Sequence, residues 1–198
     1  MTQRKGWLQA LSGNKSTKEF VLESLNFLSD IPGVGVLVKG HQTWTEYREH
    51  DFQQKLIAFL DPLSDLSDEE RKSFAAKAGD PGEAERFGST LLLLVEESED
   101  FEKPRIYGRL YTACAQGHVP WADLSRLCKM VHRSFFEDLE LLRSFAPGLQ
   151  PDHKVQAQAL SAQGFLMETG LDAGPHATAG YHYDLTPYGR QLVKFGLD

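Results

Sequence analysis

The sequence predicts a mainly α protein, in which an N-terminal helical bundle of about six helices precedes a small C-terminal α-β-β-α module. Apolar residues recur at steps of three and four over residues 121–145, the spacing of one helical face. Three earlier segments match a helix-start motif. After Pro147-Gly148 the pattern changes, and residues 181–185 alternate as a strand does. These observations predict three segments: a flexible basic lead-in over 1–15, a helical bundle over 16–147 and the small module over 148–198.

The charge of the chain is uneven and acidic. Its formal net charge at pH 7 is −7. Between Asp61 and Lys103 there are 13 acids against 5 bases, whereas residues 1–20 carry four bases against one acid. Nucleic-acid binding draws much of its affinity from Lys and Arg contacts to phosphates. An acidic chain without a basic stripe therefore disfavours unaided binding to nucleic acid.

The two cysteines, Cys114 and Cys128, each fall inside a helical pattern, and no CxxC or His/Cys zinc spacing is present. We expect both to be buried, reduced thiols; a disulfide or metal pair is the alternative. The N-terminus lacks the layout of a signal peptide, and no apolar run approaches the length of a membrane-spanning helix. We therefore expect a cytoplasmic protein.

One sequence motif, the capping box, predicts the start of a helix at three places. Ser16–Glu19, Thr43–Glu46 and Ser67–Glu70 each place a hydroxyl residue three positions before a glutamate. The hydroxyl accepts from an N–H of the first turn, and the glutamate reaches back to the N–H of the capping residue. Each match precedes a helical apolar pattern, which strengthens the prediction.

Six helices follow from these starts and from the apolar spacing. Asp61-Pro62 is expected to end the second, because the residue before a proline is disfavoured in helical angles. Leu91–Leu94 leave the fourth almost no polar side, so we expect it to be central and surrounded. Gly117 is expected to end the fifth. The predicted ranges are 17–29, 44–60, 68–78, 83–97, 104–116 and 121–145.

The segment IPGVGVLVKG, residues 31–40, permits two interpretations. Pro32, Gly33 and Gly35 argue against a regular helix start, and the branched residues suit a short strand or a buried extended link. Alternatively, the uncharged run 31–38 contacts a membrane surface, with the basic lead-in attracted to anionic lipid. The candidate membrane contacts are Val34, Val36 and Leu37.

The C-terminal pattern predicts a short helix over 152–163, a strand over 164–170 and a second strand over 181–185. Tyr181, Tyr183 and Leu185 fall on one face of the second strand, and His182 falls on the other. Thr186-Pro187 then starts a last helix, with threonine as the N-cap and proline at the first position.

Two stretches carry a family resemblance. "ALSAQGFL" (159–166) looks like the end of a recognition helix running into a wing strand, and "YDLTPYGRQL" (183–192) looks like the second wing strand and closing helix. The module thus resembles the second half of a winged-helix domain of bacterial regulators. The resemblance implies DNA binding through the helix before the wing and through basic wing residues. Here that helix carries only Lys154, and residues 171–180 contain no Lys or Arg, which favours binding to protein.

The sequence predicts no catalytic, cofactor or metal site. There is no GxSxG elbow, no Walker A or Rossmann glycine spacing and no HExxH pattern. Glu46 and His50, four apart on one helix, permit a metal site with His41 or Asp51. A zinc or pH-sensing cluster around the wing is a further alternative, drawn from His153, His176 and His182.

We therefore expect a non-catalytic interaction or regulatory protein that binds another protein through the bundle or the winged-helix-like module. The first alternative is a DNA-binding winged-helix regulator. The second alternative is a peripheral membrane effector that acts through residues 1–40. The sequence also permits a homodimer. The candidate partner-binding residues are Lys154, Gln158, His176, His182 and Arg190.

Overall fold

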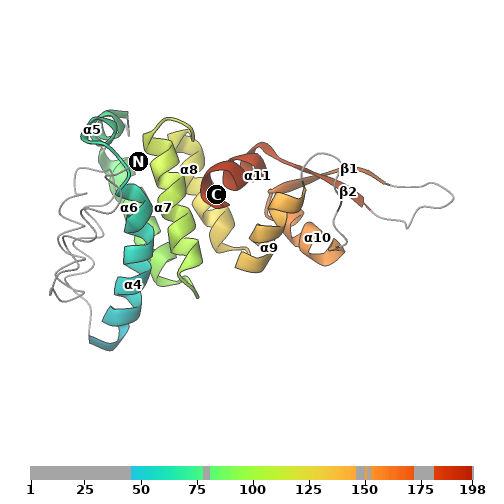
Figure 1. The fold of residues 1–198 in the computed structure, drawn as a ribbon, viewed down its shortest axis with the longest axis horizontal. Coiled ribbons are helices and arrows are strands. Elements are labelled where there is room, and N and C mark those ends of the chain that lie inside the picture. Colours follow the sequence, from blue (N-terminus) through green and yellow to red (C-terminus); the bar gives the residue numbers. More distant parts are fainter. Residues whose placement is uncertain (1–45, 78–80, 146–149, 151–152, 172–180, 198) are drawn as a thin grey trace. The chain divides into compact units, whose positions relative to one another are not determined.

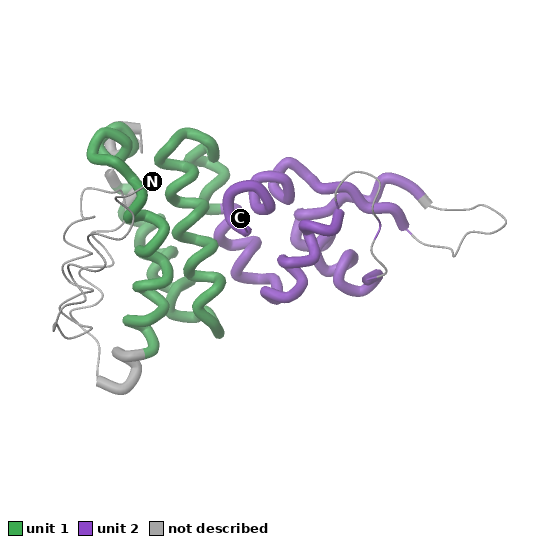
Figure 2. The backbone as a smooth tube through the Cα atoms, in the orientation of Figure 1, with its two compact units in different colours: residues 1–125 green, residues 126–198 purple. Residues whose placement is uncertain are grey.

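A computed structural model describes residues 46–77, 81–145, 150, 153–171 and 181–197 (Figure 1). The described residues are mainly helical with one two-stranded antiparallel sheet, which confirms the predicted fold class. The chain divides into two compact units, unit 1 (Met1–Ser125) and unit 2 (Arg126–Asp198) (Figure 2). The basic lead-in, the first predicted helix and the capping boxes at Ser16 and Thr43 lie outside the described residues.

The described part of unit 1 is an assembly of helices in which α7 holds the central place. α7 packs against α4 most extensively, and also against α5 and α6. Ten of its residues are buried, among them Tyr107, Leu110 and Tyr111. The elements are α4 (Glu46–Leu63), α5 (Asp68–Lys77), α6 (Pro81–Glu96), α7 (Glu102–Ala115) and the first residues of α8 (Trp121–His132).

The prediction that the leucine-rich fourth helix is central and surrounded is wrong. In α6, Leu91 and Leu94 are buried but Leu93 is 54% exposed. Four consecutive leucines cover all sides of a helix, so their burial depends on how many neighbours the fold supplies. Within the described residues, α7 has that set of neighbours and α6 does not.

α4 and α7 approach each other closely at Gly108. A Cβ built on Gly108 would lie 2.2 Å from the carbonyl oxygen of Phe59, so a residue with a side chain does not fit without a shift. One turn later, the Thr112 hydroxyl lies 3.0 Å from the carbonyl oxygens of both Pro62 and Gly108. Its bond to Pro62 occupies a carbonyl in the last turn of α4, which extends to Leu63, beyond the predicted end at Asp61-Pro62.

An aromatic cluster fills the core on the side of α7 that faces α5 and α6. Tyr111 lies at its centre, with ring centroids 5.4 Å from Phe74, 5.8 Å from Phe87 and 5.9 Å from Phe59. Trp121, at the start of α8, completes it with edge contacts to Phe74 and Phe87. Edge-to-face pairs of this kind add to the free energy gained by burying the rings.

The helix ends of unit 1 follow local rules. Ser67 and Glu70 form the predicted capping box: the Ser67 N–H donates to Glu70 Oε2 at 2.8 Å, and the Glu70 N–H donates to Ser67 Oγ at 3.2 Å. The bond from the Ser67 N–H is the main reason that the pKa of Glu70 lies below its ordinary value. Gly117, at a φ of 81°, ends α7 as predicted.

Unit 2 contains the rest of α8 and the elements that follow it. Helix α10 (Lys154–Ala162), strands β1 (Leu166–Leu171) and β2 (Tyr181–Leu185) and helix α11 (Pro187–Leu192) occur in the predicted α-β-β-α order. The remaining elements are α9 (Phe136–Leu141), the 3-10 helix η1 (Leu142–Ser144) and the π-helical turn η2 (Val193–Leu197).

The prediction of one continuous helix over 121–145 is wrong, because the chain breaks after α8. The Ser134 hydroxyl donates to the Met130 carbonyl oxygen at 3.0 Å, and the Ser134 N–H donates to Val131 with the shorter step of a 3-10 turn. Phe135 is then extended, with φ −71° and ψ 142°, and it precedes α9. Apolar spacing persists through the break, which is why periodicity alone did not reveal it.

Gly108→Ala is expected to lower the free energy of unfolding by about 1–3 kcal/mol, because the added methyl group forces α4 and α7 apart. Urea denaturation followed by tryptophan fluorescence measures it, since Trp121 lies in the adjacent core. Gly170→Ala is the control, because a Cβ there meets nothing within 4 Å. Equal effects of the two substitutions would contradict the close-approach argument.

Ser67→Ala is expected to cost about 1 kcal/mol at neutral pH through loss of the cap. Because the pKa of Glu70 is depressed in the folded state, the contribution of its carboxylate is complete above the unfolded pKa and is lost as pH falls through the folded value. Glu70→Gln keeps the acceptor but does not titrate. We expect the stability of the wild type to fall more steeply with acidification than that of Glu70→Gln; parallel curves would refute this role.

Candidate interaction surface of unit 2

Unit 2 places two consecutive helices before a β-hairpin and a closing helix. α9 contacts α10, α10 contacts β1, and α11 contacts β2. The break in the predicted long helix thus places two separate helices, α8 and α9, before α10. The described order is α8-α9-η1-α10-β1-β2-α11-η2.

The hairpin has one buried face and one exposed face. Leu166 pairs with Leu185, and Met167 with Asp184; an irregularity between Glu168 and Gly170 shifts the register. Leu166 and Tyr183 are buried, whereas Met167, His182 and Asp184 are exposed. The predicted alternation of β2 is confirmed for Tyr183, but Tyr181 is half exposed despite lying on the same face, its ring centroid 6.5 Å from that of Tyr183.

The junction between α10, the hairpin and α11 accounts for the residues that carried the resemblance. Gly164, at a φ of 88°, ends α10, with its N–H donating to Ser161 and that of Phe165 donating to Leu160. The Thr186 hydroxyl caps α11 by accepting from the Gly189 N–H at 3.1 Å. A Cβ on Gly189 would lie 2.2 Å from the Phe165 carbonyl oxygen. These residues in "ALSAQGFL" and "YDLTPYGRQL" therefore have structural roles.

Gln150 closes the outer edge of β2 with its side chain. Its Nε2 donates to the Tyr183 carbonyl oxygen at 2.9 Å, and the Tyr183 N–H donates to its Oε1 at 2.9 Å. The amide thus satisfies both main-chain groups of one residue, as a neighbouring strand does. Gln150 precedes α10 in the chain, so the pair of hydrogen bonds joins this residue to the hairpin.

The exposed face of α10 is nearly uncharged. Ala157 and Leu160 point into the core, and Lys154 is the only charged residue of the helix. Val155 is 75% exposed, and Ala159 and Ala162 extend the apolar surface on this side of the helix. Gln158 is exposed as well.

The predicted partner-binding residues lie on three different elements. Lys154 and Gln158 are four residues apart on the exposed face of α10. His182 is exposed on β2, opposite Gly170. Arg190 is exposed on α11, and its Nη1 donates to the Leu185 carbonyl oxygen at 2.5 Å, which ties it to the end of β2. His176 lies outside the described residues.

A basic surface on α8 was missed by sequence reasoning. Arg126, Lys129 and Arg133 are all exposed, and their spacing of three and four residues places them on one side of the helix. The expectation that the chain lacks a basic stripe is therefore wrong at this one surface, although the chain as a whole is acidic. The signal was present, because these residues fall off the apolar face of the predicted helix; the net charge concealed it.

The described residues hold no group of three or more His, Cys, Asp or Glu side chains that could bind a metal ion. Cys114 and Cys128 are buried and free, as predicted. Burial raises the pKa of Cys114 to about 12, with a smaller effect of Asp123, so this thiol is protonated and a poor nucleophile at neutral pH. The alternative metal site combines Asp51 with His41, Glu46 and His50. Of these four side chains, the structure describes that of Asp51.

None of the described helices is long and apolar enough to cross a membrane. The predicted membrane contacts Val34, Val36 and Leu37 lie outside the residues that the structure describes, and so does the buried-link alternative for residues 31–40. Comparisons with protein-family models, curated proteins and solved structures give no match to this chain. Its function is therefore argued from the surfaces of unit 2.

Gln150→Ala is expected to expose the Tyr183 amide, lowering its protection against hydrogen exchange by about tenfold, since a lost pair of main-chain partners costs about 1–2 kcal/mol. Hydrogen exchange is the appropriate measurement because unit 2 contains no tryptophan. Gln158→Ala, on the exposed face of α10, is the matched control and should leave the exchange unchanged. Protection that survives Gln150→Ala would mean that other groups hold the edge.

Proposed function

We propose that this chain is a non-catalytic interaction protein whose unit 2, a winged-helix-like module, binds another protein through the exposed face of α10. The observation that supports this proposal is the chemistry of that face. This face presents Val155 and two alanines with a single lysine. A helix that reads DNA instead presents basic and hydrogen-bonding side chains to the base edges.

Apolar burial supplies the free energy of such an interface. Covering a fully exposed valine contributes about 1.5–3 kcal/mol, and alanines allow a partner backbone to approach closely. Lys154 and Gln158 lie beside this apolar patch and fit the polar rim that surrounds a protein interface. Lys154 thus binds at the rim and takes part in no chemical step.

A second candidate, a DNA-binding regulator, is favoured by one observation. α8 and α9 provide the helices before α10 that a helix-turn-helix requires. Over residues 126–198 there are seven Lys and Arg against eight Asp and Glu, so unit 2 is close to neutral although the whole chain is acidic. Its affinity for DNA would fall steeply with salt.

Quantitative affinity capture from native host lysate tests the proposal, with the wild-type chain and Val155→Glu run side by side, each with and without nuclease. We expect a stoichiometric protein partner that survives nuclease and is lost from Val155→Glu. Leu93→Glu is the matched control, because it introduces the same charge at an exposed apolar residue of unit 1.

Retention of the partner by Val155→Glu would exclude the α10 face as its site. Loss from Leu93→Glu as well would attribute the effect to added negative charge. Capture of nucleic acid, or of proteins that disappear with nuclease, would support the DNA-binding candidate in place of the first.

A further inference from the structure

Three exposed cations at the C-terminal end of α8 form a compact basic face, defined here as Arg126 and Lys129 of α8 and Arg133, the residue directly after it. It spans about 10 Å along the helix axis, from a rise of 1.5 Å per residue. Among the described residues, none forms an ion pair with any of the three. By contrast, Arg105 and Arg143 each pair with a glutamate three residues earlier on their own segments.

Aromatic residues flank this basic face at both ends. The guanidinium of Arg126 lies 5.7 Å from the centre of the Tyr188 ring of α11, a contact that restrains its plane. Two residues beyond Arg133, Phe135 is 70% exposed, the largest exposed fraction of an aromatic side chain in the described residues. Its Cα lies within about 7 Å of that of Arg133, because two residues span no more. Arginine and exposed aromatic residues are the types that dominate interface energetics.

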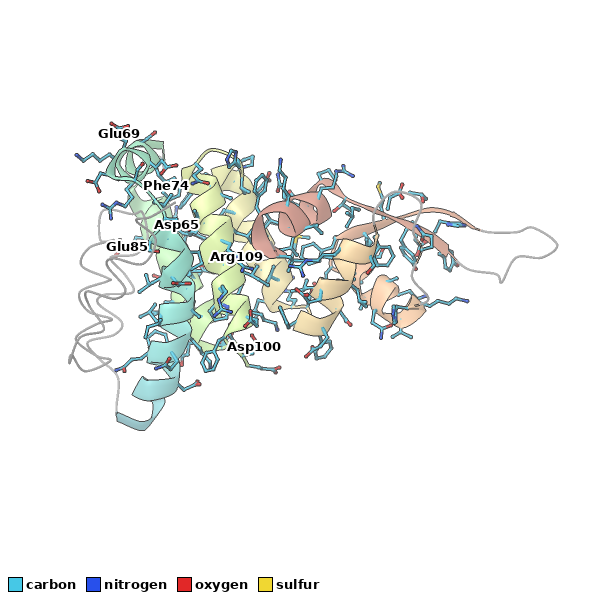
Figure 3. All side chains as sticks on the ribbon, viewed as in Figure 1. Asp65, Glu69, Phe74, Glu85, Asp100 and Arg109 are labelled. Carbon is cyan, nitrogen blue, oxygen red and sulfur yellow. The ribbon has the colours of Figure 1, made fainter. Side chains whose placement is uncertain are left out.

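The size of the face distinguishes between anionic partners. Proteins that bind duplex DNA tightly neutralise about 6–10 phosphates, whereas this face offers three cations. The acids of unit 1, such as the exposed Asp65, Glu69 and Glu85 (Figure 3), add to a net charge of −7 that opposes a long polyanion. A short segment with a few carboxylates matches three cations in number and in length, and arginine binds carboxylates in bidentate geometry.

We propose that the basic face of α8 docks an acidic segment of a protein partner, with an apolar residue of that segment packed on Phe135. The inference rests on the proposed function, because it adds a second contact surface for the protein that unit 2 binds. It assigns the partner a chemistry: carboxylates beside an apolar side chain.

Fluorescence anisotropy of the full-length chain with a labelled probe tests the inference. The probe is a short peptide of glutamates around one central leucine, and a DNA duplex of equal charge serves as the second arm. Replacing Arg126, Lys129 and Arg133 by glutamine is expected to weaken peptide binding by about tenfold, because each exposed pair contributes a modest share. Phe135→Ser is expected to weaken it similarly while keeping the salt dependence.

The matched control replaces Lys72, Arg86 and Lys194 by glutamine, three exposed cations elsewhere on the chain. We expect this variant, with the same net charge, to bind the peptide like the wild type. Equal weakening in both variants would overturn the inference, because net charge alone would then explain it. Absence of peptide binding, or tighter binding to the duplex that is lost with the basic face, would also overturn it.

The capture experiment separates this inference from the proposed function. A partner lost from Val155→Glu but retained by the glutamine variant of the basic face would support the α10 surface and refute the acidic-segment contact. A partner lost from both, with the Lys72, Arg86 and Lys194 control unaffected, supports the two surfaces together. Far-UV circular dichroism of each variant checks that the helices are intact.

Discussion

The crossing of α4 and α7 at Gly108 is the constraint on which unit 1 depends. Because the two backbones nearly touch there, α4 and α7 make the most extensive contact between two helices of the described structure. That crossing sets the direction of α7, and α7 carries Tyr111, around which α5, α6 and α8 place their aromatic rings. Unit 2 uses the same device, since Gly189 brings α11 against the main chain at Phe165.

Much of this architecture could be predicted from local chemistry. The Ser67–Glu70 box, the Gly117 helix end and the Thr186 cap depend on neighbours within a few residues, so sequence patterns reported them correctly. Asp100 shows the limit of that reasoning. It matches no capping box, because Lys103 stands three residues later, yet its carboxylate accepts from the main-chain N–H groups of Glu102 and Lys103 in the first turn of α7.

Long-range arrangements were less accessible. Apolar periodicity runs unbroken through Ser134, although the chain becomes extended at Phe135 and one expected helix is two. The burial of α6 was overestimated because a leucine run does not specify how many neighbours cover it. The basic face of α8 was hidden for a different reason: an average over an acidic chain says nothing about where three cations gather. The spacing of these cations could be read from the sequence, whereas their exposure and that of Phe135 beside them became visible only in the structure.

The Gln150 amide has a consequence for the behaviour of the protein in concentrated solution. A two-stranded sheet has two open edges, and unpaired main-chain groups on such edges recruit strands from other molecules. By occupying the N–H and carbonyl of Tyr183, the glutamine denies both groups to an approaching chain. The bulge between Glu168 and Gly170 makes β1 a poor template at the other edge. Both features disfavour the pairing of these edges with strands of other molecules.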